Sequence, residues 1–276
     1  MNLKRAYQTL HWLNLDVVLG ALLCHRAAAQ LPNGHGVFDW PTATVLMAVV
    51  FVIYTSDRLI DNLTNKPTTA RHLFHQKHHK WLIRSILLLS IGGIIGVFLL
   101  PRSVLYWGFL LASITALYLL GVFKAGKKDW FEGLKDVIVP LVYSLGVWGT
   151  ALVLQPVLTW EMLLLGFAFW LITQQNLLLV AYFESFVVET GHSLPIRWGE
   201  DFTRRVLMVL LLMVLFICLS SLVFTTHRYV VRLSLVLLSM AFWQHWICQN
   251  RDRFLPNEKY RYLSEATFLL PLLVWD

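Results

Sequence analysis

Two aspartates stand four residues apart in the YTSDRLID segment over residues 54–61, which ends a long apolar run. On a helix this spacing places the carboxylates of Asp57 and Asp61 on one face. Paired carboxylates are ligands for a hard cation such as Mg²⁺, which in turn binds substrate phosphates. The pair is therefore a candidate metal site, and the alternative is a solvated loop in which both aspartates pair with basic neighbours.

A second acidic pair, Glu184 and Glu189, follows another apolar run. If both pairs face one compartment, the four carboxylates could hold Mg²⁺ against a diphosphate, with cations neutralising the remaining charge. The candidate diphosphate-binding cations are Arg58, Lys66, Arg71, Lys124, Lys135 and Arg197. Taken singly, the lysines fit better with the ordinary excess of basic residues in cytoplasmic loops. The residues expected to line a pocket for the acceptor or lipid tail are Asn14, Tyr54, Asn176 and Tyr182.

Three histidines, His72, His75 and His79, share one face if residues 72–79 form a helix. Such a face could bind zinc, iron or haem. No cysteine or acidic ligand is spaced to complete a tetrahedral site. We therefore favour an amphipathic cytoplasmic segment whose histidines face headgroups or a bound diphosphate.

The elements that must position these groups are membrane-spanning helices. The chain has 276 residues, 57% hydrophobic and 14% charged, which leaves too few polar residues to cover a soluble globule. The net charge of +7 does not indicate nucleic-acid binding, because the basic residues lie between long apolar runs. Runs of about 20 residues predict about nine helices in one transmembrane domain over residues 1–276, in contact with membrane lipids. The runs cover residues 12–31, 41–60, 81–100, 103–123, 136–154, 160–183, 206–224, 229–248 and 262–275.

Nine crossings would divide the basic residues unequally between the two sides. Four of the 23 Lys and Arg residues fall on one side, and the other nineteen face the opposite compartment. The four are Arg26, Arg102, Arg228 and Arg232. Because cytoplasmic loops carry the excess of basic residues, we expect a cytoplasmic N-terminus and an external C-terminus. The expected location is a bacterial inner membrane, with both acidic pairs on its cytoplasmic face.

These features together resemble the UbiA superfamily of intramembrane prenyltransferases. The segments that carry the resemblance are residues 15–21 (LDVVLGA), 57–67, 124–135 and 193–199 (SLPIRWG). The resemblance implies nine helices with acidic motifs after the second and the sixth. It also implies transfer of an isoprenoid chain from a polyprenyl diphosphate to a lipophilic acceptor, with Mg²⁺ held by the four acidic residues Asp57, Asp61, Glu184 and Glu189.

The chain also departs from that family. The first motif usually reads N-D-x-x-D-x-x-x-D, and here Ile53 and Tyr54 stand where its Asn and first Asp would be. Glutamates replace the aspartates of the second motif. Fewer carboxylates favour a rival hypothesis, a catalytically degenerate UbiA-like scaffold that binds a quinone, pigment or lipid, or a subunit of a larger membrane complex.

The predicted orientation can be tested with tags. We expect tags at residue 1 and within residues 66–80 to be cytoplasmic and a tag after Asp276 to be external, because the basic residues are so unevenly divided. A membrane-impermeant reagent added from one side measures their accessibility. Labelling of both termini from the same side would contradict the nine-helix arrangement.

Overall fold

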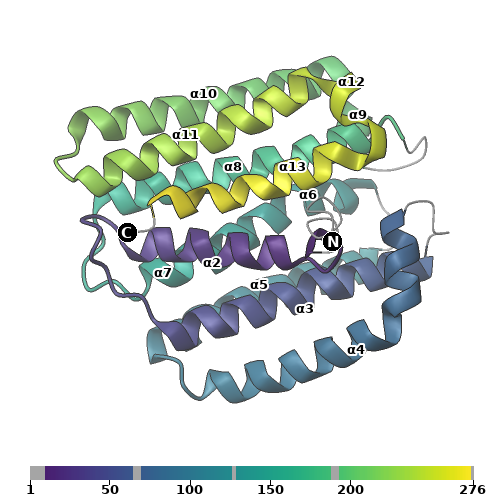
Figure 1. Cartoon of the computed structure of the whole chain (residues 1–276), viewed down its shortest axis with the longest axis horizontal. Coiled ribbons are helices and arrows are strands. Elements are labelled where there is room, and N and C mark those ends of the chain that lie inside the picture. Colours follow the sequence, from purple (N-terminus) through teal and green to yellow (C-terminus); the bar gives the residue numbers. More distant parts are fainter. Residues whose placement is uncertain (1–9, 65–69, 126–128, 188–192, 275–276) are drawn as a thin grey trace, which may run out of the picture.

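The computed structural model describes residues 10–64, 70–125, 129–187 and 193–274. All regular elements in these ranges are helices. The long helices run back and forth between two ends of the molecule (Figure 1), and we call the end that carries α9 and α12 the α9 end. The long helices are α2 (Leu15–Ala29), α3 (Trp40–Thr64), α4 (Ala70–Val97), α5 (Arg102–Ala125), α6 (Asp129–Ser144), α8 (Trp160–Glu184), α10 (Glu200–Phe224) and α11 (Arg228–Gln249). The short elements are η1 (Leu145–Gly149), α7 (Thr150–Leu152), α9 (Leu194–Trp198), α12 (Arg251–Phe254), η2 (Pro256–Glu258), α13 (Lys259–Ala266) and η3 (Thr267–Val274).

Each predicted apolar run overlaps a helix or a series of joined helices. Five helices in the described part of the chain are long and apolar enough to cross a membrane: α3, α4, α8, α10 and α11. The all-helical prediction is therefore confirmed, and these five helices support integration into a membrane. A total of nine crossings and their orientation stay predictions.

One apolar core joins α2, η1, α8, α10, α11 and η3. At its centre Trp148 of η1 stacks on Phe169 of α8 with ring centroids 5.0 Å apart, and Phe169 meets the edge of Phe268 of η3 at 6.1 Å. Helix α2 packs against η3 closely because Gly20 has no side chain: a Cβ there would lie 2.8 Å from Cβ of Phe268. The first and last described helices are thus neighbours in the core.

Helix α6 contains Pro140, which lacks the N–H that would bond to the carbonyl of Asp136 one turn earlier. Gln174 of α8 supplies the missing donor, with Nε2 2.7 Å from that carbonyl oxygen. The wider turn of the π-helix η1 follows, and two of its carbonyls also bond to side chains: Trp107 Nε1 donates to Leu145, and His25 Nδ1 lies 2.9 Å from the Val147 oxygen. The break in this helix is therefore held by α2, α5 and α8.

Helix α4 lies at the periphery and packs mainly on α3. Between residues 73 and 97 only His75 and Leu82 are buried. Of the glycines in the Gly92–Gly96 step, Gly96 faces α3, since a Cβ there would lie 2.7 Å from Cγ2 of Val45, whereas a Cβ on Gly92 would meet nothing within 4 Å. Close helix packing therefore depends on Gly96 alone of this pair.

This difference predicts the outcome of two matched substitutions. Gly96→Val should overlap Val45 and lower the free energy of unfolding by about 1–3 kcal/mol, as overpacked sites do. Gly92→Val, which points into open space, should change it by less than about 0.5 kcal/mol. Thermal unfolding of both variants in detergent measures the difference, and equal effects would contradict the α3–α4 contact.

Candidate functional site

A group of charged side chains is buried where the start of α2 meets α3 and α13. We call His11, Asp16, Arg58 and Glu265 the polar centre. His11 Nδ1 lies 2.7 Å from Asp16 Oδ2 and 3.3 Å from Glu265 Oε2, and Arg58 Nη2 lies 3.8 Å from Glu265 Oε1. None of the four side chains is more than 13% exposed. Two carboxylates and two basic groups are thus withdrawn from solvent inside an apolar bundle, where ionisable groups are expensive and commonly functional.

Local structure before α2 explains how His11 reaches this position. Asn14 adopts the left-handed conformation (φ 57°), which asparagine tolerates better than most residues, and its N–H donates to the carbonyl of His11. The chain therefore turns sharply and folds His11 back over the first turn of α2. Asp16 lies in that first turn, where the helix dipole favours a carboxylate. The Asn14 side chain also donates to Thr55 Oγ1 at 3.3 Å and so links the turn to α3.

Aromatic residues and α4 surround the polar centre. The ring of Tyr262 meets the edge of His11 at 5.9 Å, and Tyr54 lies close enough to interact electrostatically with Glu265, Arg58 and Asp16. His75 of α4 is fully buried, with Nε2 2.7 Å from the backbone oxygen of Trp12. Three helices thus fix the short segment that carries His11.

The donor atoms of His11, Asp16 and Glu265 all lie within 4.8 Å of one another. Two carboxylate oxygens suit Mg²⁺, whereas an imidazole nitrogen suits a divalent transition metal better. The set therefore fits a divalent cation in general. The same four residues also pair with one another, since His11 lies against both carboxylates and Arg58 against Glu265.

Two of the acidic residues predicted from the sequence, Asp57 and Glu184, do not belong to the polar centre. Asp57 is exposed on α3, and its neighbour Arg58 turns inward to Glu265. Glu184, at the end of α8, forms an ion pair with Arg261 of α13. Two of the predicted residues, Lys66 and Glu189, lie outside the described residues. The side chains of Asp61, Arg71 and Lys124 also lie outside the described part of the chain.

Of the remaining predicted residues, Asn14 and Tyr54 lie beside the polar centre. Tyr182 belongs to a different network at the end of α8, where its hydroxyl donates to Glu200, 3.0 Å away. Lys135 and Arg197 are exposed near the contact between α6 and α9, and Asn176 is half-buried in α8. The structure therefore gathers two predicted pocket residues and Arg58 at one place.

Sequence reasoning missed three members of the polar centre, His11, Asp16 and Glu265. Asp16 and Glu265 each stand inside a predicted apolar run, and the rule that a charge in a span needs a partner could have selected them. The histidine face does not act as a unit in the described residues, because His75 lies against Trp12 while His79 is exposed and lies against the carbonyl of Gln76.

Comparisons with known protein families, with curated proteins and with solved structures found no match to this chain. The resemblance to the UbiA superfamily rests on the sequence segments quoted above, and the site rests on its own geometry.

The buried charges of the polar centre predict a large effect on stability. Glu265→Gln would remove the carboxylate that pairs with Arg58 among the described residues, and breaking a buried ion pair costs about 3–5 kcal/mol. The matched control is Asp57→Asn. Asp57 is exposed on α3 next to Arg58, so this variant should change the free energy of unfolding by less than about 0.5 kcal/mol.

Thermal unfolding in detergent compares these variants. Adding Arg58→Gln to Glu265→Gln should recover part of the loss, because the double variant leaves no unpaired guanidinium. A double variant that loses the sum of the two single effects would show that Arg58 and Glu265 are not coupled.

Proposed function

We propose that the protein is a membrane-embedded, prenyltransferase-like enzyme. In this proposal it transfers an isoprenoid chain from a polyprenyl diphosphate to a lipophilic acceptor. The observation that carries the proposal is the polar centre, in which donors of His11, Asp16 and Glu265 lie within 4.8 Å of one another beside Arg58. The two substrates would be lipid-soluble except for the diphosphate of the donor. Buried metal-ligating groups inside an apolar bundle suit such a reaction, because they could bind the diphosphate while the apolar parts lie among the helices.

The reaction breaks the bond between C1 of the isoprenoid and the diphosphate oxygen, and diphosphate leaves with the electron pair. The acceptor forms the new bond to C1 and gives up a proton. Arg58 would contribute a guanidinium fork to the leaving diphosphate, since this geometry suits phosphate oxygens. Tyr54 and Asn14, beside Arg58, would contact the part of the substrate next to the diphosphate. The apolar side chains of the core would receive the tail.

Asp16 and Glu265, with His11, are the residues of this centre that would hold a divalent cation, Mg²⁺ in the hypothesis drawn from the sequence. A bound cation would neutralise charge on the departing diphosphate. Asp57 and Asp61 remain candidates for a second role at the end of α3. Asp57 is one residue and Asp61 three residues from Arg58 in the sequence. A diphosphate bound by Arg58 would therefore lie at the end of α3 that carries both aspartates.

A second candidate function is a UbiA-like scaffold that binds a quinone, pigment or lipid, or serves as a subunit of a membrane complex. The observation that favours it is the internal pairing of charges: Glu265 with Arg58 and Glu184 with Arg261. In a scaffold these pairs would hold α13 in place and no diphosphate would compete for them.

Diphosphate release separates the two functions. The purified protein is supplied with labelled geranylgeranyl diphosphate, Mg²⁺ and a native lipid extract. We expect turnover in the wild type and a roughly thousandfold fall for Asp16→Asn and for Asp61→Asn, because loss of a transition-state interaction of about 4 kcal/mol has that effect. Asp201→Asn, an exposed carboxylate at the start of α10, is the matched control and should keep wild-type turnover.

The pattern among the variants locates the site. Loss in Asp16→Asn with a retained melting temperature supports the polar centre, and loss in Asp61→Asn alone supports the end of α3. A well-folded wild type that releases no diphosphate with several chain lengths and acceptors would overturn catalysis and favour the scaffold.

A further inference from the structure

The end of α11 and the short helix α12 carry a group of aromatic rings and an arginine at the α9 end of the molecule (Figure 1). We call Trp243, Trp246, Arg253 and Phe254 the aromatic cluster. The ring centroids of Trp243 and Trp246 lie 5.2 Å apart, and those of Trp246 and Phe254 lie 5.0 Å apart. Because α11 is long and apolar enough to cross a membrane, its end is where the chain would leave the hydrocarbon, a depth at which tryptophan is enriched.

The guanidinium of Arg253 is held at the surface by two of these rings. Its Cζ lies 5.6 Å from the Trp246 centroid and 5.5 Å from the Phe254 centroid. The nearest acidic residue along the chain, Asp252, pairs with Arg251 at 3.3 Å. Among the residues that the structure describes, none forms an ion pair with Arg253, and its side chain is exposed. The N–H groups of this guanidinium can therefore be donated to a phosphate from outside the chain.

The two tryptophans use their indole N–H groups differently. Trp243 Nε1 donates to the Leu263 carbonyl at 3.1 Å, which fixes this ring against α13. Trp246 is 39% exposed, and its indole N–H meets no acceptor in the described part of the chain. The surface thus offers a neutral donor beside a charged one, and both can bond to the oxygens of one phosphate.

An apolar stripe leads from the aromatic cluster toward the middle of α11. Its exposed residues are spaced three or four apart and so share one helix face: Leu235, Ser239, Phe242 and Trp246. The Ser239 hydroxyl donates to the Leu235 carbonyl at 2.8 Å, so it adds no unsatisfied polar group to the stripe. From residue 235 to residue 246 the stripe is about 16 Å long, at about 1.5 Å per residue. This length is about half of a hydrocarbon core of about 30 Å, which is the depth that one acyl chain occupies.

We propose that this surface binds one anionic phospholipid of the adjacent leaflet. The phosphate accepts hydrogen bonds from the Arg253 guanidinium and the Trp246 indole N–H, and one acyl chain lies along the stripe over Phe242 and Leu235. The donors and the stripe follow one another in the same order as the headgroup and the chain of a phospholipid. In the predicted orientation this end is cytoplasmic, and anionic lipids of the cytoplasmic leaflet attract basic side chains. None of these residues belongs to the polar centre, and the site does not depend on the proposed prenyl transfer.

A phospholipid fits this face better than a second copy of the chain does. Copies inserted in one membrane share an orientation, and a twofold interface joins the same patch of both subunits. Packing on this face would therefore bring two Arg253 side chains together, and like charges repel one another. An anionic headgroup instead supplies the charge opposite to that of the guanidinium.

Native mass spectrometry of the full chain in detergent tests the site by titration with phosphatidylglycerol or phosphatidylethanolamine. We expect the wild type to bind one phosphatidylglycerol about tenfold more tightly than phosphatidylethanolamine, whose ammonium group offsets the phosphate charge. Arg253→Gln should weaken binding of phosphatidylglycerol about tenfold and remove the preference, because a charge-assisted hydrogen bond is lost. Trp246→Phe keeps a ring beside Arg253 but loses the N–H, so it should weaken binding about threefold.

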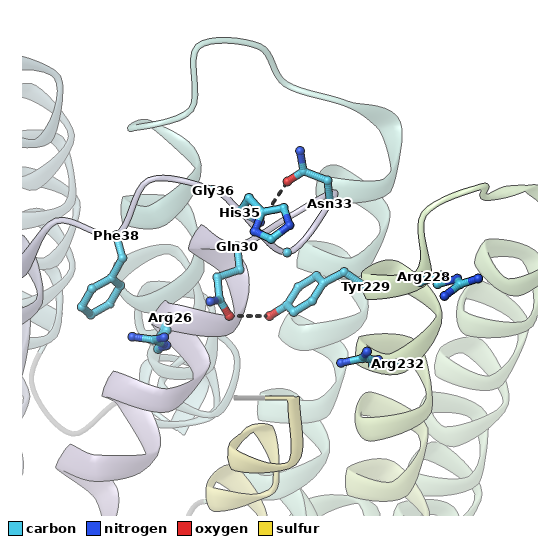
Figure 2. Close-up of a pocket in the computed structure, with 10 residues that line it drawn as sticks. Arg26, Gln30, Asn33, His35, Gly36, Phe38, Arg228, Tyr229 and Arg232 are labelled. Carbon is cyan, nitrogen blue, oxygen red and sulfur yellow. Dashed lines mark hydrogen bonds between the residues drawn. The ribbon is translucent and has the colours of Figure 1, made fainter. Parts of the chain in front are cut away.

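The other end of α11 provides the matched control. Arg228 begins this helix and is exposed, and it lines a pocket of about 650 Å³ beside the end of α2 (Figure 2). Arg228→Gln should therefore leave binding at the aromatic cluster unchanged. Because Arg253 is exposed as well, both variants should fold, and their melting temperatures without lipid check this.

Equal binding of the two lipids to the wild type would overturn the proposal, and so would equal effects of Arg253→Gln and Arg228→Gln. A dimer that excludes phosphatidylglycerol would assign the face to a second copy instead. Inorganic phosphate should not displace the lipid, because it makes no contact with the apolar stripe. Displacement by phosphate would assign the donors to a dissolved ligand and also overturn the lipid site.

Discussion

The structure depends on one constraint: inside an apolar bundle, polar backbone groups must find their partners within the protein. Helix α6 illustrates it, because Pro140 frees the Asp136 carbonyl and Gln174 of α8 bonds to it. The same arrangement recurs near η3, where the thiol of Cys24 lies 3.6 Å from the Phe268 carbonyl, three residues before Pro271. In both places a polar side chain of one helix bonds to a carbonyl near a proline of its neighbour and so joins the two helices.

The same constraint applies to charge and explains the importance of α13. This short helix carries Glu265, which meets Arg58 of α3, and Arg261, which meets Glu184 of α8. It thus connects the two sides of the bundle through ion pairs, while η3 continues its chain into the core. A diphosphate at the polar centre would have to compete with Glu265 for Arg58. Binding of substrate and the packing of α13 are therefore coupled in any mechanism that uses Arg58.

The polar centre and the pocket beside Arg228 differ in how their charges are arranged. The polar centre combines acidic and basic side chains in a small buried space. This arrangement suits a bound metal ion, or a ligand that replaces one side chain in an ion pair. The pocket at the opposite end is lined by Arg26, Arg228 and Arg232 together with neutral polar and aromatic residues. Helix α2 contributes to both, with Asp16 in its first turn and Arg26 in its last.

The sequence by itself determined the all-helical class, because apolar runs must be buried in lipid or core whatever their neighbours are. Each predicted run overlaps a helix, but the sequence did not show that α4 begins at Ala70 or that the run over residues 136–154 is broken after Ser144. It also selected Asn14 and Tyr54 for an acceptor or tail pocket and Arg58 for diphosphate binding, and the structure brings these three residues together at the polar centre. Only the tertiary structure decided which charged groups meet. The four-residue spacing of Asp57 and Asp61 fixes a shared helix face, but it does not say whether that face turns inward. In the structure Asp57 is exposed, and the neighbouring Arg58 is the residue that turns inward. Glu265 lies 254 residues after His11, so its contact with His11 and Asp16 depends on the packing of α2 against α13, which no local pattern encodes.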